Sequence, residues 1–263
     1  MNENSSKPKI SIYVVGHKQF DMPVKSSIYI PLMVGNQYEE LPEGWLSDST
    51  GENISGKNPR YNELTGFYWI WKNSNADIVG VCHYRRYFIT PVGKIKNVMT
   101  GKKSKFITEN YIKKSLSSHD VILHNKTFIP GGNLEQLCVK KNDSKECEKS
   151  RLSREILDVM NHSFQKLYPE DYVTYKKVMN GRYAHLLNIV VCYKEIFNQY
   201  CEWLFPLLYD MEKEIDRQFP ERKHERCMGL IAERLLDVWV LKKSLRIKEC
   251  FTVNTERIDW KPW

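Results

Sequence analysis

The segment from Asp77 to Phe88 constrains the fold of this chain most, because an apolar run leads there directly into a charged cluster. Ile78 to Cys82 is short and apolar, as a buried strand is, and a histidine, two tyrosines and two arginines follow it. Ligands of open α/β sheets bind at the carboxyl ends of strands, and arginine suits a bidentate contact with phosphate. Arg85 and Arg86 therefore indicate a site for a phosphorylated, nucleotide-bearing substrate. The alternative is a pair of structural ion pairs at a sheet edge.

Strand, helix and strand follow one another in the first half of the chain. Ile10 to Val15 is a β-branched run, typical of a strand. A helix is expected from Asn58 as the N-cap, with Pro59 at the first helical position, to about Lys72. The strand of residues 78–82 comes next. This order implies parallel strands joined by crossovers, and so an α/β fold with a mostly parallel, Rossmann-like central sheet.

The second half of the chain is richer in helix. Apolar residues recur at helical spacing over residues 151–167, 171–179, 195–219 and 222–241. Two further strands are expected over residues 186–193 and 246–253. A length of 263 residues fits one domain. We expect a nucleotide-binding α/β part at about residues 9–125 and a helix-rich, acceptor-side part at about 151–263.

The composition points to anionic partners and to a reducing compartment. There are 40 Lys and Arg against 32 Asp and Glu, a formal net charge of +8. The 7 cysteines are irregularly spaced and lack metal-ligand spacing, and no stretch approaches the length of a membrane span. We therefore expect a cytoplasmic protein. No helix-turn-helix, RNP or zinc-finger pattern is present, and the basic residues form no stripe, so no nucleic-acid partner is expected.

Candidate binding residues gather at the strand ends and in the loop before the first helix. His17 and Lys18 follow the first strand, where an exposed turn is the alternative interpretation. The loop of residues 51–58 precedes a helix N-terminus, which favours anions, although its residues also cap that helix. The residues expected to contact a nucleotide-sugar are His17, Lys18, Asn53, Ser55, Lys57, Asn58, Tyr61, His83, Tyr84, Arg85 and Arg86.

Several motifs together resemble one bacterial family. They are the segments Ile12 to Lys18, Ile28 to Gly35, Gly51 to Ser55, Lys57 to Thr65, His83 to Phe88, Tyr200 to Phe205 and Gly229 to Leu236. The chain is similar, from about Ile10 to Val253, to the family named domain of unknown function 4422, which is found in capsular and exopolysaccharide gene clusters. The segment between Asn125 and Met160 departs from the family pattern.

The resemblance implies a glycosyltransferase with a GT-A-like fold. Some members are linked to galactose or galactofuranose transfer. The implied reaction moves such a sugar from a UDP-sugar to a hydroxyl of a lipid-linked glycan in capsule, exopolysaccharide or O-antigen synthesis. The alternatives are a catalytically inactive nucleotide- or glycan-binding module and, with less support, a nucleic-acid-binding protein.

Such a transfer needs a stabilised diphosphate leaving group and a base for the acceptor hydroxyl. Arg85 and Arg86 are candidates for the first task; in an extended segment their side chains point to opposite faces, so one of them contacts phosphate. No Asp-x-Asp pair is present, so we expect no required metal and at most a weak dependence on Mg²⁺ or Mn²⁺. The candidate bases are Glu63, His185 and Glu233, and the candidate acceptor-binding residues are Asn188 and Arg234.

Each of these candidates also has a structural interpretation. Glu63 can simply be an acid that the helix dipole stabilises near the helix N-terminus. His185 can be a core residue whose hydrogen bonds are made within the protein, and Glu233 can form an ion pair with an arginine. At the end of the chain, the aromatic tail Ile258 to Trp263 and the charge of +8 predict contact with an anionic membrane. The alternative is that this tail packs on the domain.

Overall fold

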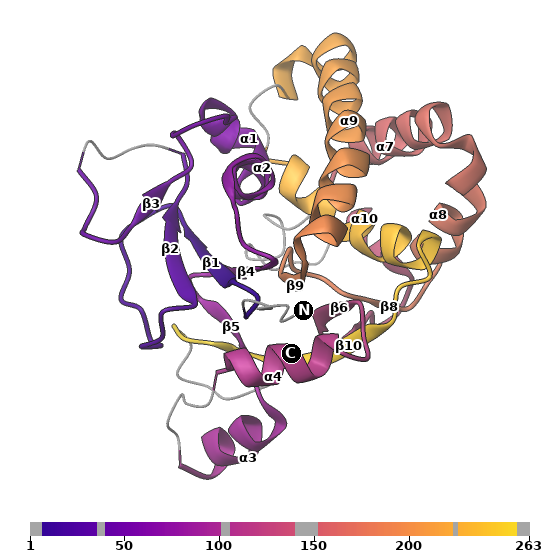
Figure 1. Ribbon diagram of the computed structural model, residues 1–263. Helices are drawn as coiled ribbons and strands as arrows, with labels where there is room; N and C mark the ends of the chain where they lie inside the picture. Colours follow the sequence, from indigo (N-terminus) through magenta and orange to yellow (C-terminus); the bar gives the residue numbers. More distant parts are fainter. Residues whose placement is uncertain (1–6, 36–39, 101–105, 140–151, 223–225, 257–263) are drawn as a thin grey trace, which may run out of the picture.

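A mixed β-sheet forms the centre of the protein (Figure 1). The computed structural model describes residues 7–35, 40–100, 106–139, 152–222 and 226–256. The strand order of the sheet is β3-β2-β1-β4-β5-β10-β6-β9. In chain order these strands are β1 (Ile10–Gly16), β2 (Tyr29–Met33), β3 (Leu46–Ser47), β4 (Ile78–His83), β5 (Arg86–Ile89), β6 (Val121–His124), β9 (Val190–Tyr193) and β10 (Ile247–Asn254). A separate small ribbon pairs β7 (Thr127–Phe128) with β8 (Tyr183–Ala184).

The pairing of these strands corrects the expected sheet. Four neighbouring pairs are parallel, namely β1–β2, β1–β4, β2–β3 and β6–β10. The other four, β4–β5, β5–β10, β4–β9 and β6–β9, are antiparallel. Because β4 pairs with β9 as well as with β5, the strands β4, β5, β10, β6 and β9 close into a barrel-like ring. The prediction of a mostly parallel, Rossmann-like and GT-A-like sheet is therefore wrong. Strands contributed from the helical half complete the ring.

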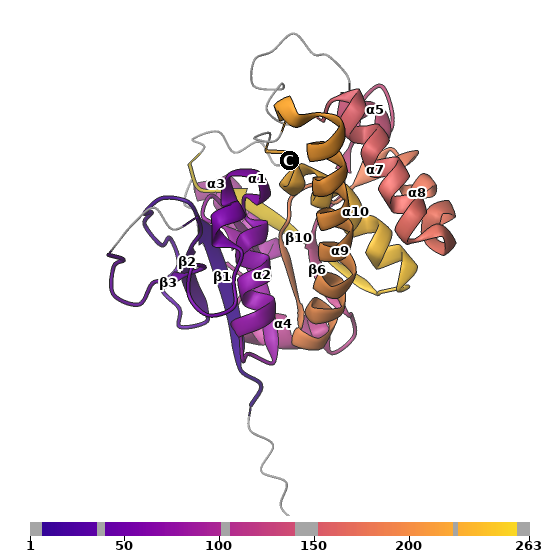
Figure 2. The same ribbon diagram turned by 90° about the horizontal axis from the view of Figure 1, so that it is seen from above.

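Helices cover both faces of the sheet. They are α1 (Asn58–Tyr61), α2 (Leu64–Asn73), α3 (Pro91–Thr100), α4 (Glu109–Leu116), α5 (Leu134–Val139), α7 (Arg154–Leu167), α8 (Tyr172–Met179), α9 (Lys194–Gln218) and α10 (Met228–Lys242), with 3₁₀ turns at Ser55–Lys57, Pro169–Asp171 and Pro220–Arg222. Helices α2, α9 and α10 lie on one side, with α7 and α8 outside them, and α4 lies on the other side (Figures 1 and 2).

Alternation along β1 explains why both faces are covered. Tyr13 and Val15 belong to the core beneath α2, α9 and α10. Ile12 and Val14 point the other way, into the core that contains residues of α4 and β10. A strand buried on both faces reads as a continuous apolar run, which is why the sequence locates it correctly.

The helix expected over residues 58–72 is broken into α1 and α2. Asn62 has φ of 55°, in the left-handed region, and ends α1. Asn58 was expected as the N-cap, but Lys57 holds that position. The Asn58 side chain instead donates to the Asn62 carbonyl (2.7 Å) and the Thr65 hydroxyl (3.1 Å) across the break. The break places Glu63 at the N-cap of α2.

None of the helices in the described ranges combines the length and the hydrophobicity that a membrane crossing requires. The aromatic tail of residues 258–263, on which the predicted membrane contact depends, lies outside the described residues, as does part of the divergent segment (residues 140–151).

Candidate active site

A pocket of about 110 Å³ lies at the carboxyl ends of β1 and β4. Because β9 runs antiparallel to β4, the segment that leads into β9 reaches this same edge of the sheet. The pocket is lined by Val15, Glu63, Val81, Cys82, His83, Arg86, Leu187, Asn188, Ile189 and Glu233. Five residues that the sequence proposed for substrate contact or catalysis therefore come together here, namely Glu63, His83, Arg86, Asn188 and Glu233.

The carboxylate of Glu63 is held in place by Asn188. The Asn188 side-chain amide donates to Glu63 Oε1 (2.6 Å) and to the backbone carbonyl of Gly229 (2.9 Å). A Cβ on Gly229 would lie 2.9 Å from Asn62 Nδ2 and 3.3 Å from Glu63 Oε1. Glycine at the start of α10 therefore permits the close approach that joins α10, the Asn188 loop and the N-cap of α2.

Two strained backbone positions flank this hydrogen bond. Asn62, which precedes Glu63, has φ of 55°, and Leu187, which precedes Asn188, has φ of 98°. Asparagine tolerates the left-handed region, but leucine does not, and such a residue costs about 1–3 kcal/mol. The surrounding fold must stabilise Leu187 in this conformation, and the conformation presents Asn188 to Glu63.

The environment of Glu233 in this pocket changes its proton affinity. Burial raises its pKa to about 7, and the negative charge of Glu63 adds to the effect, while Arg234 and Arg86 oppose it. Arg234 Nη1 lies 3.1 Å from Glu233 Oε2. A carboxyl group whose pKa lies near neutrality can accept a proton and release it at physiological pH.

The imidazole of His83 is neutral at physiological pH. Burial lowers its pKa to about 3, and the positive charges of Arg86 and Arg85 contribute. The backbone N–H of Arg85 donates to His83 Nδ1 (3.4 Å) across the tight turn between β4 and β5. His83 can therefore offer hydrogen bonds at the pocket but carries no charge there.

Cations surround the ring of Tyr84, next to the pocket. Lys18 Nζ lies 5.4 Å and the Arg85 guanidinium 5.0 Å from the ring centroid, and His17 contacts the ring edge-on at 5.6 Å. Glu256, just after β10, pairs with Lys18 (3.7 Å) and with Arg85 (3.5 Å). Arg86 lines the pocket, whereas Arg85 lies over Tyr84, so the two arginines diverge.

Arg226 joins this cluster, although no pattern in the sequence predicts a role for it. Its Nε donates to Asn62 Oδ1 (2.7 Å), and its charge helps burial to lower the pKa of His17. Arg226 is 140 residues from Arg86 in the sequence, and no local pattern points to it. The contact with Asn62 at the helix break holds Arg226 beside the pocket.

A family model described as "Domain of unknown function (DUF4422)" matches residues 11–244. The chain belongs to this family, as its motifs indicated. No curated protein matches it significantly. Among solved structures, the chain is similar to the apo structure of the bifunctional glycosyltransferase WbbM, with 27% sequence identity and a TM-score of 0.76. The match covers 95% of this chain and 46% of the WbbM chain, so this DUF4422 chain spans less than half of that protein.

In this DUF4422 chain, three of the predicted binding residues bond within their own segment. Asn53 Nδ2 donates to the carbonyls of Ser49 (3.1 Å) and Gly51 (2.9 Å). The Ser55 hydroxyl donates to buried Asp48 (2.5 Å), and Asn58 bridges the helix break described above. These three side chains do not line the pocket. They hold the loop that leads into α1.

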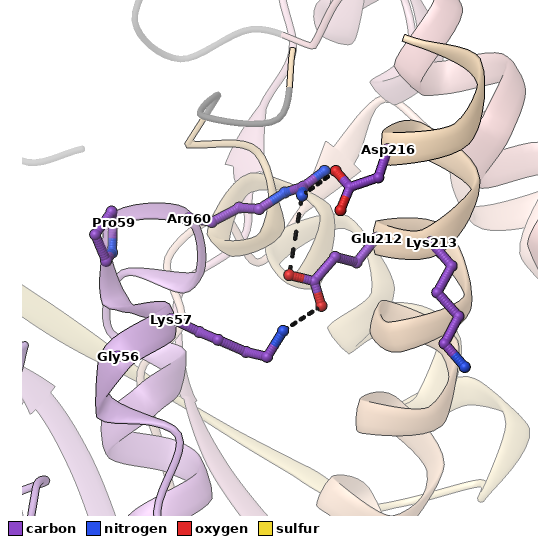
Figure 3. Close-up of a pocket in the computed structure, with 7 residues that line it drawn as sticks. All are labelled: Gly56, Lys57, Pro59, Arg60, Glu212, Lys213 and Asp216. Atoms are coloured by element: carbon purple, nitrogen blue, oxygen red, sulfur yellow. Dashed lines mark hydrogen bonds and ion pairs between the residues drawn. The ribbon is translucent and has the colours of Figure 1, made fainter. Parts of the chain in front are cut away.

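Lys57 lines a second hollow, between α1 and α9 (Figure 3), and Tyr61 is buried beside it. Its volume is about 450 Å³. Lys57 Nζ lies 2.7 Å from Glu212, Arg60 Nη1 lies 2.6 Å from Asp216, and the Tyr61 hydroxyl donates to Glu212 (3.0 Å). These pairs neutralise the Lys57 and Arg60 charges and fasten α1 to α9, so we assign them to the architecture around the pocket.

His185 and Arg234 are buried behind the pocket and do not line it. His185 Nδ1 lies 2.5 Å from Asp237 Oδ1, and its backbone N–H donates to Asp237 Oδ2 (2.8 Å). Burial favours protonation of Asp237, yet these contacts hold its pKa below the ordinary value. Arg234 Nη1 donates to the Leu230 carbonyl (2.8 Å) besides pairing with Glu233. Within the described residues, no group of three or more metal-ligating side chains is assembled.

Proposed function

We propose that this chain is a glycosyltransferase that moves a sugar from a UDP-sugar to a hydroxyl group. The observation that carries the proposal is one pocket that holds Glu63, Glu233 and Arg86 at the carboxyl ends of β1 and β4. The similarity to WbbM over nearly the whole chain supports it. Transfer requires a base, a group that stabilises positive charge on the sugar, and cations for the diphosphate, and side chains at this edge of the sheet are suited to all three tasks.

In this proposal the acceptor hydroxyl oxygen attacks the anomeric carbon of the donor sugar. The proton of that hydroxyl passes to Glu233, whose pKa of about 7 suits a general base. The bond from the anomeric carbon to the diphosphate oxygen breaks, and the electron pair leaves with the diphosphate. Glu63, fixed by Asn188, stabilises positive charge that develops on the sugar. The reaction inverts the anomeric centre.

Arginine and lysine side chains stabilise the leaving diphosphate in this scheme. Arg86 contacts it from the pocket, and Arg85, Lys18 and Arg226 supply the positive field beside it. Preorganised cations of this kind can act where other transferases use a divalent ion. We therefore propose that the reaction requires no metal, with at most a weak effect of Mg²⁺ or Mn²⁺.

The finer assignments rest on what the family resemblance implies. We propose galactose or galactofuranose as the transferred sugar and a lipid-linked glycan of capsule, exopolysaccharide or O-antigen as the acceptor. A lipid-linked acceptor places the enzyme at the cytoplasmic face of an anionic membrane. The net charge of +8 supports such a contact.

The test is the release of UDP from UDP-galactose and UDP-galactofuranose by wild-type protein and the Glu233→Gln variant. We expect Glu233→Gln to lower turnover roughly 100-fold or more, because it removes the base, while UDP affinity changes little. Glu202→Gln, an exposed carboxylate of α9, is the matched control and should retain activity. A wild-type protein that binds UDP but turns over neither donor would be an inactive binding module, and full activity in Glu233→Gln would refute the role of Glu233.

A further inference from the structure

The ribbon of β7 and β8 presents an aromatic pair to solvent. Phe128 and Tyr183 are directly paired across the ribbon, with ring centroids 5.2 Å apart. Their exposed fractions are 46% and 59%. The Arg182 guanidinium lies 5.1 Å from the centroid of the Phe128 ring. Large aromatic side chains are usually mostly buried, so an exposed pair flanked by a cation is a feature that packing alone does not require.

The topology places this ribbon at the same edge of the sheet as the pocket. Strand β9 is antiparallel to both β4 and β6, and Val190 lies opposite Val81 on one side and Leu123 on the other. The carboxyl ends of β4 and β6 therefore lie at one edge, together with the start of β9. Strand β7 follows β6, and β8 precedes β9, so the ribbon extends from that edge.

The chain between the ribbon and the pocket is short. Tyr183 precedes Asn188 by five residues, so their Cα atoms are at most about 18 Å apart. His185, between them, is anchored to Asp237 of α10 and fixes the path of this connection. A short oligosaccharide that enters the pocket with one end can thus reach Tyr183 with the other.

We propose that Phe128, Tyr183 and Arg182 form a platform that binds the acceptor glycan. One face of a sugar ring presents C–H groups with partial positive charge, and the face of an aromatic ring is negative, so the two attract each other. The guanidinium of Arg182 supplies donors for sugar hydroxyls beside that contact. This inference rests on the proposed function, since it assigns the acceptor of that reaction to this surface.

The structural alternative is that the two rings only stabilise the ribbon. Cross-strand aromatic pairs do so by small amounts. Substitution by threonine retains the β propensity of each position but removes the ring, whereas Phe128→Trp retains an aromatic face. The two interpretations therefore predict different results for these variants.

The experiment measures binding to a glycan array of short fragments of bacterial surface polysaccharides, with calorimetric titration of UDP on the same samples. Full-length wild-type protein is compared with Phe128→Thr, Tyr183→Thr and Phe128→Trp. Tyr193→Ala is the matched control, because Tyr193 is also exposed but ends β9 at the opposite edge of the sheet. Circular dichroism melting of every variant reports on folding.

We expect the threonine variants to lose glycan binding by roughly fivefold or more, and Phe128→Trp and Tyr193→Ala to retain it. UDP affinity should be unchanged in all of them. Any of three results would overturn the platform. The threonine variants could bind glycan as well as the wild type does, or Tyr193→Ala could lose as much binding as they do. The wild-type protein could also bind UDP but no glycan. Failure of the proposed function has a different signature, because either UDP binding would be absent or the wild-type protein would bind UDP and the glycan without turning over a donor.

Discussion

Two carboxylates share one pocket, but their surroundings differ. Glu63 accepts a hydrogen bond from Asn188, whereas Glu233 is buried beside Arg234 and has a pKa near 7. A buried carboxyl group with a pKa near neutrality is suited to proton transfer, and a carboxylate held by a hydrogen bond beside the reacting centre is suited to charge stabilisation. At the residue scale, we therefore assign proton transfer to Glu233 and charge stabilisation to Glu63.

The pH dependence of activity tests this assignment through Glu63→Gln. Removal of the neighbouring negative charge favours the ionised form of Glu233, so its pKa falls below about 7. The acidic limb of the kcat/KM profile should then move to lower pH, by about 0.5–1 unit. Glu202→Gln, which changes an exposed carboxylate, should leave the limb in place. A limb that stays fixed in Glu63→Gln, or moves to higher pH, would contradict the coupling of the two acids.

At the scale of the elements, His185 and Asp237 join two segments that carry pocket residues. His185 precedes Asn188 by three residues, and Asp237 follows Glu233 by four, which places both acids on one face of α10. The buried contact between His185 and Asp237 therefore holds the Asn188 loop against the helix of Glu233.

The variant His185→Ala distinguishes this positioning role from the catalytic role that the sequence suggested. It leaves the buried Asp237 carboxylate without its imidazole, and we expect the free energy of unfolding to fall by about 2–5 kcal/mol. His119→Ala, at the opposite edge of the sheet, should cost less than about 1 kcal/mol. Urea unfolding measures both. Unchanged stability together with lost turnover would show that His185 acts on the substrate instead.

Helix α3 carries exposed apolar residues that suit the proposed membrane contact. Its apolar residues Val92 and Ile95 are 59% and 61% exposed and share one helical face. No acidic residue occurs from residue 78 to residue 108, a stretch with five lysines after residue 90. In Figure 1 the helix projects away from α9 and α10. Exposed apolar side chains combined with lysines favour an anionic bilayer surface.

Co-sedimentation with phosphatidylglycerol vesicles tests this contact. We expect the double substitution Val92→Ser and Ile95→Ser to reduce the bound fraction several-fold, because each removes buried apolar area at the interface. Val173→Ser is the control, since Val173 is an exposed valine on α8. High salt should also release the wild-type protein. Equal losses in the two variants, or no binding at low salt, would leave α3 without this role.

At the scale of the whole molecule, the sequence locates elements better than it predicts their pairing. Strands β1, β4 and β10 lie close to the predicted positions. The order and direction of the strands depend on contacts between residues far apart in the chain. The apolar pattern of residues 246–253 predicts a strand, but nothing local indicates that this strand separates β5 from β6.

The same limit applies to the candidate site. Arg86 is evident from the sequence because it adjoins a strand end, and Glu63, Asn188 and Glu233 were candidates from separate segments. Only the tertiary structure brings those three together, through the break at Asn62 and the strained Leu187. No local sequence pattern indicates Arg226. Lys57 is paired with Glu212 of α9, which is more than 150 positions away in the sequence.

Calorimetric titration of UDP tests most directly whether a nucleotide diphosphate binds at this edge of the sheet with Arg86 on its phosphates. We expect UDP to bind wild-type protein and Arg86→Ala to weaken binding about tenfold or more, since a hydrogen-bonded cation at phosphate contributes about 1.5–3 kcal/mol. Arg246→Ala, an exposed arginine at the opposite edge of the sheet, should bind UDP as the wild type does. UDP affinity that is unaffected by Arg86→Ala, or that falls equally in Arg246→Ala, would contradict the account.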